Sequence, residues 1–108
     1  MNGSEPSAAL DALGDPTRRA IVELLAAGPA SVQHLADQLP VSRPAVSRHL
    51  RLLKEADLVE DEAMGTRRMY RLREEGVDAI RTYFEQVWNE AAMRYRLAAE
   101  NLPESEAR

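Results

Sequence analysis

Two helix starts lie close together near the middle of this chain, and the segment between them is very short. Ser31 precedes one run of residues with apolar side chains at helical spacing, and Ser42 precedes another. Pro40 ends the first helix, so only Pro40, Val41 and the cap connect the two. A connection of that length cannot reverse the chain into a fully overlapping antiparallel pair. It fits the steep crossing of a helix-turn-helix, which we predict over residues 31–55.

The helix that starts at Ser42 has one apolar side and one polar side. Val46, Leu50 and Leu53 recur at i, i+4 and i+7, so we expect them to form a buried stripe. The residues on or beside the opposite side are available to contact a partner, and they are Arg43, Pro44, Ser47, Arg48 and Arg51. The helix therefore presents basic and polar side chains to its surroundings.

Two helices are expected before this motif. Ser4 followed by Pro6 is typical of a helix start, and Gly14 ends that helix. Asp15 then begins a second helix as its N-cap, with Pro16 at the first helical position. Together with the helix-turn-helix, these segments predict a small helical body.

After the helix-turn-helix, the spacing of the apolar residues changes from helical to strand-like. We expect two short antiparallel strands, roughly 59–63 and 68–72, joined by a tip that contains Gly65. Helices followed by such a hairpin predict a winged helix-turn-helix with its wing at 58–72. The expected fold class is mainly α with a β-hairpin wing (α+β), in a single domain over residues 1–108.

The C-terminal part is expected to be one long helix from about Gly76 to Asn101. Its apolar residues are separated by steps of three and four, which is close to the heptad seam of a coiled coil. At 1.5 Å per residue this helix would be ~39 Å long. That length exceeds what a body of about seventy residues can cover, so part of the helix should extend past the body.

The net charge of −4 hides a strong asymmetry in where the charges lie. Two stretches, residues 42–54 and 64–73, carry cations and no carboxylate; their basic residues are Arg43, Arg48, Arg51, Lys54, Arg67, Arg68, Arg71 and Arg73. Attraction to phosphate depends on the local field, because exposed charges more than ~10 Å apart are screened at ordinary salt. This acidic chain can therefore present a basic surface to double-stranded DNA.

In a helix-turn-helix the second helix enters the major groove of DNA, and its first turns meet the base edges. Arginine there can bond bidentately to guanine, serine can bond to several bases, and Pro44 can touch a thymine methyl group. The caps Ser31 and Ser42 leave backbone N–H groups at helix starts, which suit phosphate oxygens. Arg67 and Arg68 are expected to reach the DNA backbone or the minor groove from the wing.

The other charged side chains of the wing have simpler interpretations. Arg71 and Arg73 are expected to be structural or to pair with nearby acids. The acidic run Glu60-Asp61-Glu62 would solvate the first strand of the wing. A further hypothesis is that this run limits non-specific affinity for DNA.

Three separated motifs in this order resemble the ArsR/SmtB family of bacterial winged-helix repressors. They are LGDPTRRAIVELL at 13–25, VSRPAVSRHLRLL at 41–53 and GTRRMYRL at 65–72, and the resemblance covers about residues 8–100. It implies a homodimer that binds a palindromic operator and represses transcription. On this resemblance the base-reading positions fall on Arg43, Pro44, Ser47 and Arg48, and the wing contacts fall on Arg67 and Arg68.

The resemblance also implies that the first and last helices, expected at 5–13 and 76–101, hold the dimer together. The aromatic side chains of the last helix are assigned to this interface and its junction with the body, and not to an effector pocket. The expected interface residues are Ala9, Leu13, Ile80, Phe84, Val87, Trp88, Ala91 and Tyr95.

The two metal sites for which the family is best known have no match in this chain. One needs a cysteine pair on the third helix, and the chain has no cysteine; the other needs histidine on the last helix, which has none. His34 with Asp37 would supply only two ligands. His49 is expected to be packed and hydrogen-bonded, with a phosphate contact as the alternative. We therefore expect no metal and no cofactor, and any small-molecule effector is unknown.

Several other function classes find no support in the sequence. The chain has no glycine-rich phosphate loop, Ser–His–Asp pattern or nucleophile elbow, so we do not expect an enzyme. No apolar run approaches the ~20 residues that span a bilayer, and no secretory signal is recognisable. We expect a cytoplasmic, nucleoid-associated protein with no membrane partner. Two alternatives stay open: a sensor on the same fold that responds to a metal or small molecule, and a winged-helix module that binds protein.

Overall fold

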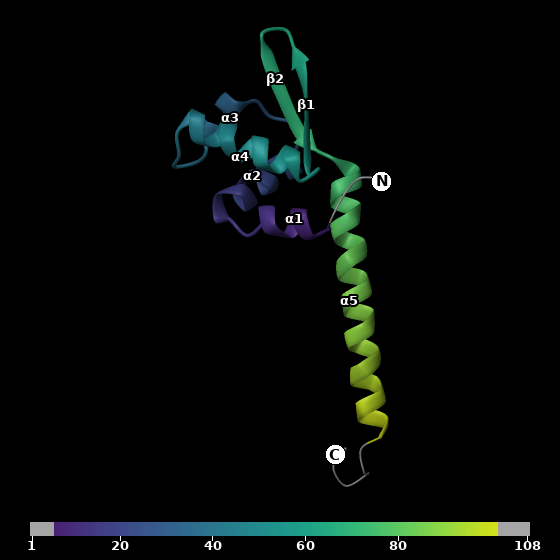
Figure 1. Cartoon of the computed structure of the whole chain (residues 1–108). Coiled ribbons are helices and arrows are strands. Elements are labelled where there is room, and N and C mark those ends of the chain that lie inside the picture. Colours follow the sequence, from purple (N-terminus) through teal and green to yellow (C-terminus); the bar gives the residue numbers. More distant parts are fainter. Residues whose placement is uncertain (1–5, 102–108) are drawn as a thin grey trace.

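The computed structural model describes residues 6–101, which form five helices and two strands (Figure 1). In chain order these elements are α1 Pro6–Ala12, α2 Pro16–Ala26, α3 Val32–Asp37, α4 Arg43–Glu55, β1 Val59–Met64, β2 Arg67–Leu72 and α5 Glu74–Glu100. The predicted fold class, helices with a two-stranded antiparallel hairpin, is confirmed. The cap expected at Ser4 lies outside the described residues.

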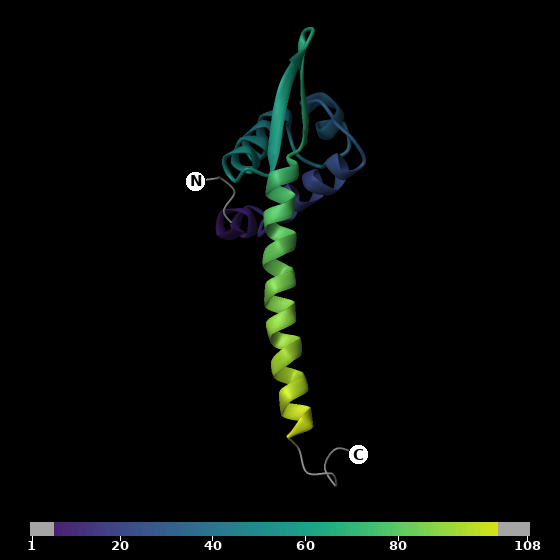
Figure 2. The ribbon, with the colours of Figure 1, turned by 90° about the vertical axis from the view of Figure 1, so that its right-hand side faces the viewer.

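The short helices and the hairpin gather at one end of α5, and the rest of α5 extends away from them as a single rod (Figure 1). Figure 2 shows the same separation after a turn of 90°, with the wing at the opposite end from the free part of α5. α5 has 27 residues, so it is about 40 Å long. The expectation that this helix extends past the body is confirmed. No helix among residues 6–101 is long and apolar enough to cross a bilayer.

Three helices start at the caps that the sequence predicts. A side-chain oxygen of Asp15 accepts a hydrogen bond from the backbone N–H of Arg18 at 3.0 Å. The hydroxyl oxygens of Ser31 and Ser42 accept equivalent bonds in α3 and α4, at 3.1 and 3.2 Å. These caps fix the residues at which α3 and α4 begin, and with them the side chains that each helix turns outward.

The core lies between α2, α3, α4 and the base of the wing. Val46, Leu50 and Leu53 of α4 have no exposed surface, which confirms the predicted stripe. Ile21 of α2 and Leu35 of α3 are equally buried. Since burying a side chain of this size stabilises a protein by roughly 1.5–3 kcal/mol, this stripe fixes the rotation of α4 about its own axis.

The wing pairs in one register, from Val59 opposite Leu72 to Met64 opposite Arg67. Each strand reaches one residue further toward the tip than predicted, because Gly65 adopts a positive φ of 65° and allows a tight turn. An isolated bridge that the sequence did not reveal joins the wing to the body. The N–H of Ala30 donates to the carbonyl of Tyr70 at 2.9 Å, and the reverse bond measures 2.8 Å.

α5 begins at Glu74, two residues before the predicted start, because Glu74 and Glu75 suit the positive end of the helix dipole. Gly76 is buried against the end of α4. A Cβ built at Gly76 would overlap the carbonyl oxygen of Asp57 and lie 3.1 Å from the Cα of Leu58. A glycine is therefore required for this close approach of two backbones.

We predict that Gly76→Ala lowers the free energy of unfolding by about 1–3 kcal/mol, because the new methyl group has no room. Helix propensity alone predicts the opposite sign, a gain of about 1 kcal/mol. Urea denaturation followed by far-UV circular dichroism, at one protein concentration, measures the difference. Asn89→Ala, at an exposed position of α5, is the control and should not destabilise the protein. Unchanged or increased stability of Gly76→Ala would contradict the close approach.

Candidate nucleic-acid interface

The outward side of α4 carries the polar residues that the sequence placed there. Arg43, Pro44, Ser47, Arg48 and Arg51 are all exposed, on the side away from the buried stripe. None of these three arginines forms an ion pair with another residue in the range 6–101. Their guanidinium groups are therefore available to a base edge or a phosphate.

The start of α3, the start of α4 and the tip of the wing enclose a shallow hollow of about 350 Å³. Its lining includes Ser31 and Gln33 on one side, Arg43 on α4, and Arg67 and Arg68 on the wing. Arg43 and Arg67 form no ion pair within residues 6–101, so they give the hollow a positive charge that suits phosphate oxygens. Ser31 itself is only 8% exposed, and its hydroxyl oxygen is already engaged in capping α3.

Arg67 and Arg68 lie on opposite faces of the wing, because successive side chains alternate along a strand. The register puts Arg68 on the same face as buried Val59, so that face is turned toward the body. Arg67 lies on the outer face at the tip, opposite Met64, and forms no ion pair within residues 6–101. The two arginines therefore cannot contact DNA in the same way.

The outer face of the wing also carries a ladder of ion pairs. Arg71 donates to Glu60 and to Glu62, each at 2.8 Å, and these carboxylates raise its pKa above the usual value, Glu60 contributing most. Arg73 donates to Asp57 at 2.9 Å and to Glu75 at 3.3 Å. The prediction that Arg71 and Arg73 pair with nearby acids is confirmed.

Asp61 differs from what the sequence suggested. Its side chain does not solvate the strand, because it is only 6% exposed and lies between two cations. One carboxylate oxygen is 2.7 Å from Nζ of Lys54, and the other is 2.8 Å from Nη1 of Arg68. The hydrogen bond from Lys54, and then that from Arg68, hold the pKa of Asp61 below its ordinary value although burial opposes this. The carboxylate therefore stays charged near neutral pH.

These pairs divide the eight cations of the two acid-free stretches into two groups. Lys54, Arg68, Arg71 and Arg73 are neutralised by acids that the fold brings in from outside those stretches. The other four of these eight cations, Arg43, Arg48, Arg51 and Arg67, form no ion pair within residues 6–101. The basic surface is thus narrower than the sequence implied, and it comprises one side of α4 and the tip of the wing.

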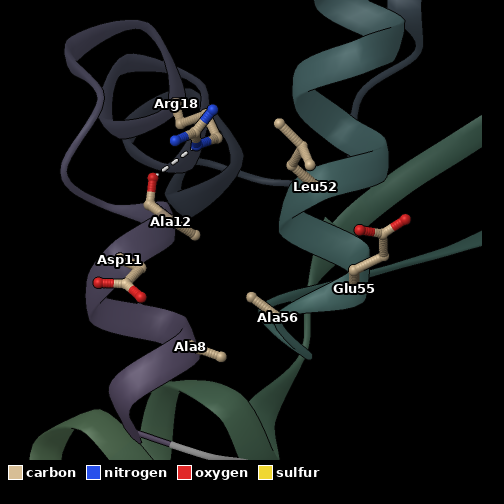
Figure 3. A pocket seen from close by; sticks show the side chains of 7 residues that line it. All are labelled: Ala8, Asp11, Ala12, Arg18, Leu52, Glu55 and Ala56. Carbon is tan, nitrogen blue, oxygen red and sulfur yellow. Dashed lines mark hydrogen bonds between the residues drawn. The ribbon is translucent and has the colours of Figure 1, made fainter.

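His49 is packed against the body, as predicted. Its side chain is 14% exposed, and Nδ1 lies 3.4 Å from Nη1 of Arg18 and 3.7 Å from a carboxylate oxygen of Asp15. Arg18 also donates from Nε to the carbonyl of Ala12, above a hollow between α1 and the end of α4 (Figure 3). The backbone N–H of Arg18, more than the charge of His49, lowers the pKa of Asp15. Arg18, which lies on α2, thus contacts both α1 and α4.

His34 makes only local contacts. Its ring Nε2 is 2.7 Å from the side-chain amide nitrogen of Gln38, and Asp37 accepts from Gln33 at 2.6 Å. No group of three metal-ligating side chains occurs among residues 6–101. The described residues therefore offer His34 and Asp37 no third ligand.

The free part of α5 exposes a continuous set of large apolar side chains. Phe84 is 54% exposed, Val87 45%, Trp88 73% and Tyr95 80%, and Ala91 lies exposed between them. No segment in the described part of this chain covers them. Exposed apolar patches of this kind mark surfaces that contact another protein.

Three of the expected interface residues are wholly or partly buried within this chain. Ala9 is 2% exposed and belongs to the core, so its side chain offers almost no surface to a partner. Its helical phase turns it toward the body and not away from it. Leu13 and Ile80 are partly buried against the same core, which leaves only a part of each side chain for a further contact.

Comparison with known proteins gives relatives along most of the chain. The helix-turn-helix domain family matches residues 13–62. An HTH-type transcriptional regulator of Mycobacterium tuberculosis is 54% identical over 90 residues, which cover 83% of this chain and 84% of that protein. An arsenical resistance operon repressor of Staphylococcus xylosus is 34% identical over 80 residues, covering 74% of this chain and 77% of that one.

A solved structure is similar over a comparable length. It is the homodimeric winged helix-turn-helix DNA-binding domain of a possible ArsR-family regulator from Mycobacterium bovis. The two folds superpose with a TM-score of 0.65 at 28% identity, covering 83% of this chain and 92% of that chain.

Proposed function

The chain belongs to the ArsR family of winged helix-turn-helix transcriptional regulators, and on that basis we propose how it binds its operator. Two copies form a homodimer, and each copy inserts α4 into the major groove of double-stranded DNA. The dimer represses transcription by occupying an inverted repeat in a promoter, which would place it at the nucleoid. Neither a cofactor nor a metal is part of this proposal.

The observation that carries the proposal is the set of unpaired cations on one side of the molecule. Arg43 and Arg48 lie in the first turns of α4, the part of the recognition helix that meets base edges. Pro44 and Ser47 share that side and would contact a thymine methyl group and a base edge. Arg51, further along α4, would contact a phosphate.

Around this reading surface, other groups would hold the DNA backbone. The starts of α3 and α4, at Ser31 and Ser42, lie beside the basic hollow and would face phosphates. Arg67 would reach the backbone or the minor groove from the tip of the wing. Arg68 would add to the field of the hollow while it stays paired with Asp61.

The exposed apolar side of α5 would form the dimer interface. An antiparallel crossing of two α5 helices centred on Ala91 puts each Phe84 against the partner's Ala98, and each Val87 against the partner's Tyr95. Large side chains then meet small ones, which is the packing that helix pairs favour. Trp88 completes this surface, and the exposed parts of Leu13 and Ile80 would extend it.

We predict that Arg48→Ala weakens operator binding by about 1–3 kcal/mol and relaxes the preference at one base position, because a bidentate contact to a base edge is lost. Parallel selections from random DNA with wild type and variant, followed by anisotropy titrations, measure both effects. Unchanged affinity and unchanged preference would remove Arg48 from the reading surface.

Arg67→Ala should weaken binding to all sequences alike. It should also make the slope of the logarithm of the binding constant against the logarithm of salt concentration (the salt slope) less steep by about one, the value expected for one lost phosphate contact. Arg71→Ala is the matched control, since Arg71 lies on the same strand but is held by Glu60 and Glu62. The salt slope of Arg71→Ala should differ less from that of the wild type than the salt slope of Arg67→Ala does. Titrations at four or more salt concentrations measure the slopes, and equal changes in both variants would exclude the assignment of Arg67.

Ala91→Glu should raise the Kd of self-association at least about tenfold, because the interface would bury an unpaired carboxylate. Gln86→Glu adds the same charge on the other side of α5 and is the control. Analytical ultracentrifugation measures both constants. An Ala91→Glu protein that dimerises as tightly as the control would contradict the proposed crossing.

A further inference from the structure

Besides the packing of Val59 and Leu72 against the core, two residues that face each other across the hairpin hold the wing to the body by polar bonds. Asp61 on β1 is paired with Tyr70 on β2 in the strand register. Tyr70 is fixed through its backbone, by two hydrogen bonds to Ala30. Asp61 is fixed through its side chain, by the ion pair with Lys54 in the last turn of α4.

Beyond this pair, toward the tip, the hairpin projects from the body and lines one side of the hollow beside α3 and α4. Residues 62–68 are all exposed, and Arg67, the unpaired cation of the wing, lies among them. Within residues 6–101, the bond between Asp61 and Lys54 is also the only ion pair that links α4 to the wing. Asp61 therefore contributes to the direction in which the tip points relative to α4.

The charge of Asp61 by itself opposes DNA binding, because a carboxylate beside a phosphate-binding hollow repels phosphates. Its position suggests a different role. The carboxylate is only 6% exposed, and both of its oxygens are engaged by cations that are themselves more than half exposed. A buried carboxylate held from two sides restricts the conformations of the groups that hold it.

We propose that Asp61 is a positioning residue for DNA binding, which holds the wing at a fixed angle to α4 so that Arg67 and Arg48 engage one site together. The inference rests on the proposed binding of DNA by α4 and the wing. In this role Asp61 touches no nucleotide. Because Asp61 already restricts the wing in the free protein, less conformational entropy is lost when the wing binds DNA.

Asp61→Asn tests this role, with Glu62→Gln as the matched control. Both substitutions remove one negative charge from β1, but Glu62 lies on the outer face and pairs with Arg71. We expect Asp61→Asn to weaken binding to the selected duplex roughly tenfold. Glu62→Gln should leave binding unchanged or tighten it up to about threefold, as expected when an acid near phosphates is removed. Tighter binding by Asp61→Asn would show that the residue only repels DNA, and would overturn the proposal.

A double variant tests whether the effect passes through the tip of the wing. If Asp61 acts by placing Arg67, the loss caused by Asp61→Asn should shrink to within about twofold in an Arg67→Ala background. An undiminished tenfold loss in that background would contradict the proposed role. Because the ion pairs hold the pKa of Asp61 below its ordinary value, the contribution of its charge is present at neutral pH and is lost only as pH falls through the lowered pKa. The ratio of wild-type to Asp61→Asn affinity should therefore stay constant between about pH 5 and pH 8.

Hydrogen–deuterium exchange of the DNA-free protein separates this inference from the proposed function. Asp61→Asn and Lys54→Met, which break the same pair from its two ends, should both speed exchange of the wing amides, whereas Glu62→Gln should not. This result would support the anchor even if the wild type bound no DNA, in which case the proposed function alone would fail. Equal wing exchange in all four proteins would overturn the positioning role.

Discussion

The rest of the structure depends on the burial of one apolar stripe of α4, formed by Val46, Leu50 and Leu53. No other rotation of α4 about its axis can bury all three side chains. Their burial between α2, α3 and the base of the wing decides which side of α4 meets solvent. The cap at Ser42 fixes where the helix begins, and therefore which residues stand in its exposed first turns. The side of α4 that we propose reads DNA is therefore held in place by core packing.

Ion pairs then decide how much of the positive charge on this acidic chain is available to DNA. The sequence places eight cations in two stretches without acids, but the fold brings Glu60, Asp61 and Glu62 against four of them, together with other acids near the base of the wing. What is left is a compact set of arginines on α4 and at the tip of the wing. A limited set of this kind favours a specific site over DNA in general, because non-specific affinity grows with the number of phosphates neutralised.

Local chemistry made much of this fold predictable from the sequence. The caps Asp15, Ser31 and Ser42, the stripe on α4 and the glycine of the wing tip are each determined by neighbours in the chain. Long-range partners were not predictable in the same way: the backbone bridge from Ala30 to Tyr70 involves no side chain, and thus leaves no trace in the sequence. The burial of Ala9 was not predictable from the sequence, because a methyl group fits a core as well as an interface. Asp61 had one signal that was overlooked, since it lies two residues from buried Val59 and therefore on the inner face of the strand.

Selection of bound duplexes from random DNA by the full chain, followed by titration of the enriched sequence at several salt concentrations, tests most directly whether the protein reads DNA as a dimer. We expect an inverted repeat with half-sites about one helical turn apart, bound by two chains. We also expect a logarithm of the binding constant that falls steeply with the logarithm of salt concentration. A folded dimer that enriches no sequence, or whose binding does not depend on salt, would contradict the role assigned to α4 and the wing.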